Sequence, residues 1–211
     1  MNEHLSNDEF RQAMEFPYPA SDYLNMAYGL CSVLQSTPDG MKKFMHRIGL
    51  AKELQDEMVP LGYLCKYFYE ESPAVEARLV LGNQAGDAVI VDRRSGAPVS
   101  SHVEITVLEN ETEHKKRVEL HKTGVVTEIV SETRLNETQG AMLRKVLTKK
   151  SGKEYPSDTM LLVFCKANNH SASLQRTFAS VADELKSSLS RFSRVLMASR
   201  NGILLDFSAP S

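Results

Sequence analysis

One short run of residues constrains the fold more than any other, because residues 159–165 read TMLLVFC. Every side chain after the threonine is apolar, yet the run is far shorter than the roughly 20 residues that a membrane-spanning helix needs. A strand with apolar side chains on both sides is typical of a sheet that is covered on both faces. The run therefore predicts a layered protein in which helices cover a mixed sheet.

Helical spacing of apolar residues dominates the first seventy residues. Ser6 followed by Glu9 forms a capping box at the start of the first helix, and the prolines at positions 17 and 19 end that helix. Further helices are predicted from Ser21 to residue 35, from Thr37 onward, and over residues 60–71.

The pattern changes after Pro73. Three short β-branched runs, separated by glycine or turn residues, are typical of an antiparallel meander. The rest of the chain predicts two helices, the buried strand, a helix over 171–192 and two closing strands. We expect an N-terminal helical region at 1–58 and an α/β domain at 59–211. The meander runs are EARLVLG, DAVIVD and HVEITVL.

Two carboxylates stand out in the second and third of these runs. The midpoint between Asp87 and Glu104 falls between Ser95 and Gly96, where turn residues stand, so regular pairing places the two acids directly opposite each other. Thr106 would lie on the same face because strand side chains alternate. Adjacent carboxylates repel, and a divalent cation such as Mg²⁺, which prefers oxygen ligands, would offset that repulsion.

The arrangement of these residues resembles the PD-(D/E)xK superfamily of restriction-endonuclease-like nucleases. Asp87 is followed after sixteen residues by Glu104, Ile105 and Thr106, on the second and third strands of a meander that comes after a helix. The likeness covers about residues 60–165 and implies an αβββαβ core with an N-terminal helical appendage. Gly86 stands where the family has proline, and Thr106 stands where it usually has lysine.

The resemblance implies a metal site and a role for each residue in it. Asp87 and Glu104 would bind Mg²⁺ or Mn²⁺, and Glu76 would be a third acid from the start of the first strand. Thr106 carries no charge. We therefore expect Lys150, in the following helix, to take over the role of the lysine that the family usually has at position 106. The alternatives stay open, because Lys150 also suits a helix C-terminus and Glu76 also suits a solvated surface.

The expected function is a metal-dependent nuclease that acts on DNA more readily than on RNA. The alternative is a catalytically inactive member of the same fold that binds nucleic acid or another protein. The N-terminal helices would bind substrate or form a homodimer. The net charge of −2 gives no global attraction to nucleic acid, so contacts would come from local basic runs at 114–117 and 149–153.

The remaining features predict an ordinary cellular environment. Three cysteines, at positions 31, 65 and 165, are odd in number and stand among apolar neighbours, which favours buried free thiols. The first ten residues lack the basic and apolar regions of a secretory signal, and no apolar run is long enough to span a membrane. We therefore expect a cytoplasmic protein without a membrane partner.

Overall fold

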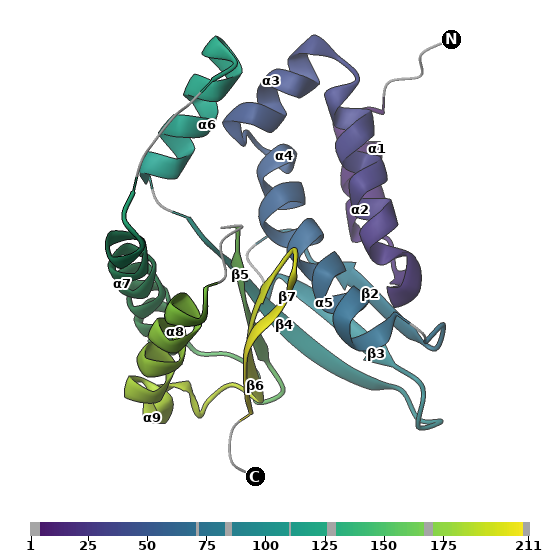
Figure 1. The fold of residues 1–211 in the computed structure, drawn as a ribbon. Helices are drawn as coiled ribbons and strands as arrows, with labels where there is room; N and C mark the ends of the chain where they lie inside the picture. The colour runs from purple at the N-terminus through teal and green to yellow at the C-terminus, as the bar shows by residue number, and fades with distance from the viewer. Residues whose placement is uncertain are drawn as a thin grey trace. The chain divides into compact units, whose positions relative to one another are not determined.

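The chain forms two compact units, residues 1–105 and 106–211. The computed structural model describes residues 5–70, 72–82, 86–109, 111–125, 130–166 and 171–208 (Figure 1). Both units contain helices and strands, so the predicted mixed α/β class is confirmed. The boundary that the sequence predicts at residue 58 falls inside the first unit, at the end of a helical turn.

The first helices of unit 1 follow their predicted caps. Helix α1 (Asn7–Glu15) begins with the expected capping box, in which the Glu9 backbone N–H donates to Ser6 Oγ and the Ser6 N–H donates to Glu9 Oε2. Helix α2 (Ala20–Gln35) follows a two-residue strand, β1 (Tyr18–Pro19). Helix α3 (Pro38–His46) starts after Thr37, whose hydroxyl accepts the Gly40 N–H over 3.0 Å.

A longer helical segment than predicted follows α3. Helix α4 (Leu50–Glu53), the π-helical turn η1 (Leu54–Met58) and helix α5 (Val59–Tyr69) run without interruption, since the residues that join them keep helical torsion angles. The sequence predicted only the last part of this segment, over residues 60–71. Proline crowds the carbonyl group four residues earlier, and the wider π turn directly before Pro60 accommodates that crowding.

The strands of unit 1 form the predicted antiparallel meander. Strands β2 (Val75–Leu79), β3 (Ala88–Asp92) and β4 (Val99–Leu108) pair in chain order, and β1 pairs with the outer side of β2. Alternate side chains on β2 and β3 are buried, so one face of this sheet carries core residues. The buried residues on that face are Val75, Ala77, Leu79, Ala88 and Ile90.

Unit 2 places a mixed set of strands beside helices. Helices α6 (Glu111–Thr123) and α7 (Glu132–Ser151) precede strand β5 (Met160–Cys165), whose side chains are all buried as predicted. Strand β6 (Arg194–Ser199) pairs parallel with β5 and antiparallel with β7 (Gly202–Ser208). The predicted helix over 171–192 divides at Leu185 into α8 (Ala172–Glu184) and α9 (Lys186–Leu189).

Helices α7 and α8 approach each other closely in unit 2. A Cβ atom at Gly140 of α7 would lie 2.8 Å from Cγ2 of Thr177 on α8. The two helices share a core with the strands of the unit. This core includes Leu143, Leu147, Leu161, Val163, Phe178, Val181, Phe192 and Val195.

Several other expectations can be compared with the structure. Cys31, Cys65 and Cys165 are buried thiols outside any disulfide, as predicted, and burial raises the pKa of the Cys65 thiol to about 12. No helix within the described ranges combines the length and the apolar character that crossing a membrane requires.

A restriction-endonuclease-like core needs β5 beside and parallel to β4. That pairing would join the two units, so this core stays a prediction.

Candidate functional site

The hairpin of β3 and β4 has the register that the sequence predicted. Ala88 lies opposite Val103 and Asp92 lies opposite Val99, which centres the turn between Ser95 and Gly96. Gly96 has a positive φ of 92°, which suits glycine in a tight turn.

Asp87 lies just before β3, and its contacts depart from regular pairing. Its backbone N–H donates to the carbonyl oxygen of Val103 over 2.9 Å, whereas the register would place Glu104 opposite it. Its side-chain Oδ2 accepts the backbone N–H of Ile105 over 2.7 Å. The Asp87 carboxylate therefore lies beside the peptide bond between Glu104 and Ile105, and it carries part of the connection between the two strands.

Glu104 is the buried acid of this hairpin, with only 5% of its surface exposed. It stands on β4 between Val103 and Ile105, which are also buried, and it shares a strand face with Thr106 because side chains alternate. A carboxylate rarely occupies such a position without a polar partner or a metal ion. The structure thus brings Asp87 to the Glu104–Ile105 peptide, while a shared ion stays a prediction.

Glu76 is not brought to Asp87. It lies on β2 opposite Val91, and Arg93 Nη1 donates to its Oε2 over 2.7 Å. Asp87 lies toward the other end of β2, where its carbonyl oxygen accepts the N–H of Val80. Four residues of extended strand separate Glu76 from Val80, which is about 13 Å. The β2–β3 register therefore favours the alternative interpretation, in which Glu76 is a surface acid paired with an arginine.

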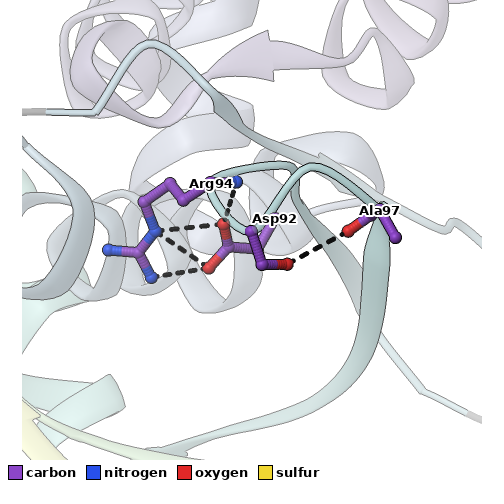
Figure 2. A network of polar contacts seen from close by, with 4 residues as sticks. Asp92, Arg94 and Ala97 are labelled. Atoms are coloured by element: carbon purple, nitrogen blue, oxygen red, sulfur yellow. Dashed lines mark hydrogen bonds and ion pairs between the residues drawn. The ribbon is translucent and has the colours of Figure 1, made fainter.

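Asp92, the other acid of this hairpin, lies at the start of the turn. Figure 2 shows its carboxylate accepting the backbone N–H of Arg94 and the guanidinium of the same residue, with the shortest of these contacts at 2.5 Å. These hydrogen bonds, first those from the Arg94 side chain, hold the pKa of Asp92 below its usual value. Arg94 also lies over the ring of Tyr69, 5.2 Å from its centroid. Asp92 is thus a structural residue of the hairpin turn.

A second group of predicted site residues meets in unit 2. A pocket of about 380 Å³ has Thr106 and Lys150 among its lining residues. The complete lining is Thr106, Glu109, Met142, Lys145, Val146, Lys149 and Lys150.

Helix α7 supplies most of this pocket through its periodicity. Along the chain, successive lining residues of this helix are alternately three positions and one position apart, which places them on one helical surface. They are Met142, Lys145, Val146, Lys149 and Lys150. The adjacent residues Leu143 and Leu147 are buried in the core of the unit. The lysine stems therefore extend from a face that borders the core, with their charges at the pocket.

The sequence did not reveal Glu109 as a pocket residue. Its side chain is only 7% exposed and forms an ion pair with Lys166, with 3.7 Å between Oε2 and Nζ. A single glutamate after a strand carries no recognisable signal, and its partner is far along the chain. Three lysines and one glutamate line the pocket, so its charge favours an anionic group.

Two further comparisons leave the site unidentified, one with the geometry of metal-binding groups and one with known proteins. Within the part of the chain that the structure describes, no group of three or more histidine, cysteine, aspartate or glutamate side chains is arranged to hold a metal ion. Comparison of the chain with protein-family models, curated proteins and solved structures finds no match.

Proposed function

We propose that the protein is a metal-dependent nuclease that hydrolyses phosphodiester bonds, in DNA more readily than in RNA. The observation that carries the proposal is the shared pocket of Thr106 and Lys150. The superfamily that the sequence resembles usually has a lysine at the position of Thr106. A lysine from helix α7 beside that position supplies the charge that threonine lacks.

The charge of the pocket suits a phosphodiester substrate. Lys150 would act on the reacting phosphate, where a fixed positive charge stabilises the negative charge that develops in the transition state. Lys145 and Lys149 would contact neighbouring phosphates, because lysine is a common point-charge partner of phosphate. The Thr106 hydroxyl can donate or accept one further hydrogen bond.

The donor set of the hairpin fits a hard divalent cation. Asp87 and Glu104 would hold Mg²⁺ or Mn²⁺ through carboxylate oxygens, the ligands that these ions prefer. The Ile105 N–H fixes the orientation of the Asp87 carboxylate through Oδ2. The ion, when bound, would lower the pKa of a water molecule and offset charge on the phosphate. Glu76 is left out of this set because Arg93 binds it at the other end of β2.

The finer parts of the proposal follow from the same resemblance. They comprise a restriction-endonuclease-like core, a cytoplasmic location, and N-terminal helices that bind substrate or form a homodimer. Each is tested separately from cleavage, by the β4–β5 pairing in an experimental structure, by fractionation of cells and by sedimentation.

One observation favours a second candidate, a catalytically inactive protein of the same fold that binds nucleic acid or another protein. Asp87 already has a structural role, because its carboxylate connects the start of β3 to the backbone of β4. Such an acid would be retained after catalysis was lost. Threonine at position 106 is also consistent with a loss of catalysis, because it stands where the superfamily usually has a lysine.

A cleavage assay decides between the two candidates. Supercoiled plasmid, a single-stranded DNA and an RNA are incubated with the full chain in Mg²⁺, in Mn²⁺ and in EDTA. We expect cleavage with either metal and none in EDTA, and loss of cleavage in Asp87→Asn and Glu104→Gln. Asp92→Asn is the matched control, since it removes a hairpin acid that serves only the turn. A wild type that cuts no substrate with either metal supports the inactive candidate.

A further inference from the structure

A separate cavity of about 930 Å³ lies among the helices of unit 1, away from the residues assigned to the nuclease. Residues of helices α1, α2, α3 and α4, and of the α2–α3 and α3–α4 connections, line it. Figure 1 shows where these helices lie in the unit. Its volume is in the range of sites that hold small organic molecules.

Three exposed apolar side chains are among the residues that line this cavity. Leu5, Val33 and Ile48 line it and are 43%, 43% and 51% exposed. Phe10 and Ala51 also line it but are almost fully buried. Large apolar side chains that remain exposed around one concave surface indicate a site that binds an apolar ligand.

One acidic side chain in the wall lacks a partner. Glu53 lines the cavity, and among the described residues its Oε2 is shielded from water with no hydrogen-bond donor in reach. The lining residues Lys43 and Asp39 neutralise each other through a 2.7 Å ion pair. A carboxylate oxygen that is withdrawn from water without a donor is unfavourable, and a positively charged donor on a ligand would relieve this.

Several contacts hold the segment around Glu53 in place. Arg47 and Gly49 adopt positive φ values of 54° and 55° in the connection before α4. The Gln55 side-chain amide donates to the carbonyl oxygens of Phe44 and Ala51 over 2.7 and 3.0 Å, and Arg47 forms an ion pair with Asp56. Backbone strain and a π turn at one place are features that functional sites often have.

We propose that this cavity binds a small amphiphilic amine, with an apolar chain or ring against Leu5, Val33 and Ile48 and a primary ammonium group on Glu53. The last torsion angle of glutamate has a broad, nearly two-fold preference, so a rotation of the carboxylate presents Oε2 to the ligand without moving the helix. This site is independent of the proposed nuclease function.

Three ligands of equal chain length test the charge requirement. Isothermal titration of the full chain uses n-octylammonium, 1-octanol and octanoate, each below its micelle concentration. We expect octylammonium to bind most tightly and octanoate most weakly. Glu53→Gln should weaken octylammonium binding about 10- to 100-fold, the worth of one charged hydrogen bond, and leave octanol unchanged. Asp22→Asn, an exposed acid of α2 that is not in the lining, should change nothing.

A second variant tests the apolar part of the cavity. It also separates a loss of binding from a loss of folding. Ile48 is half exposed, so Ile48→Ser should leave the fold intact, as circular dichroism would show, while it weakens binding of both octylammonium and octanol. Equal binding of all three ligands, or tighter binding of octanoate, overturns the proposal. A dimer that Ile48→Ser dissociates would assign the cavity to a second copy, and a lysine-bearing amphipathic peptide that binds more tightly than octylammonium would assign it to a protein partner. Either result overturns the proposal as well.

Discussion

The cavity of unit 1 and the pocket of unit 2 have opposite chemistry. Exposed apolar side chains and a glutamate whose Oε2 has no donor among the described residues line the cavity in unit 1, whereas three lysines and one glutamate line the smaller pocket in unit 2. The whole chain has a net charge of only −2. The comparison shows that a nearly neutral chain can line two concave surfaces with different charge and apolar area, the properties on which ligand binding depends.

The two sites also differ in how the chain builds them. In unit 2 the lysines follow helical periodicity, so neighbouring turns of α7 bring them together. In unit 1 the wall depends on two residues with positive φ, a π turn and the side chain of Gln55. We therefore expect substitutions to change the charge of the unit 2 pocket without unfolding it, and to change the shape of the unit 1 cavity only at a cost in stability.

The largest expected effect is on the chemistry of unit 2. Lys150→Ala should lower metal-dependent cleavage by about two to three decades, or about 3–4 kcal/mol in activation free energy, because it removes a charge from the transition state. Metal binding, measured by titration, should stay unchanged. Lys145→Ala and Lys149→Ala are matched controls, which should weaken substrate binding only and recover at lower salt.

The outcome for Lys150 also sharpens the choice between the two candidate functions. A wild type that cleaves but tolerates Lys150→Ala would show that another group supplies the charge. If the wild type is inactive only because it lacks the lysine that the superfamily usually has at position 106, Thr106→Lys should restore weak cleavage. Failure of that variant would favour the interaction protein.

The next effect concerns the shape of unit 1. A Cβ atom at Gly40 would overlap the carbonyl oxygen of Leu34 and lie 2.8 Å from Thr37 Oγ1. Gly40→Ala should therefore lower the free energy of unfolding by about 3 kcal/mol, as overpacking does. Hydrogen exchange should increase in residues 1–105 and stay unchanged in 106–211.

A glycine with open space around it is the control for this change. Nothing lies within 4 Å of a Cβ placed at Gly29 of helix α2. Gly29→Ala should therefore raise stability by up to about 1 kcal/mol, through the better helix propensity of alanine. Equal destabilisation by both substitutions would mean that the Leu34 contact does not limit position 40.

A smaller effect is expected between α7 and α8 in unit 2. Gly140→Ala should cost about 1–2 kcal/mol, because its Cβ would crowd the methyl group of Thr177. Thr177→Ser removes that methyl group, so a double-mutant cycle should recover most of the loss. Gly152→Ala is the control, since its nearest neighbours would lie at 3.7 Å.

The smallest effects come from one aspartate–arginine pair in each unit. Arg94 holds the pKa of Asp92 below its ordinary value, and Arg194 does the same for Asp206. Because both folded pKa values are lowered, the stability that these pairs contribute is present above about pH 4 and is lost as the pH falls through the folded values. Asp206→Asn should cost a few tenths of a kcal/mol at pH 7, as exposed pairs do. The difference from wild type should shrink as the pH falls through the lowered pKa of Asp206.

The sequence by itself determined the local features of this protein. The Ser6 capping box, the Thr37 cap and the Gly96 turn depend on residues a few positions apart, so their signals are complete within a short window. The burial of β5 on both faces follows from a run without polar side chains. The same reasoning placed Lys150 on the helix surface that lines the pocket with Thr106, although its catalytic role stays a prediction.

Only the tertiary structure decided the features that depend on distant parts of the chain. The helix continues across Pro60 through a π turn, and Asp87 binds a backbone group eighteen residues away. Glu109 forms an ion pair with Lys166, which lies two helices and a strand farther along the chain. Glu76 was expected near Asp87, but the β2–β3 register separates them and Arg93 binds it. The unit 1 cavity likewise needs four helical segments at once. Such contacts are absent from any short window of sequence, because they form only when packing brings separate segments together.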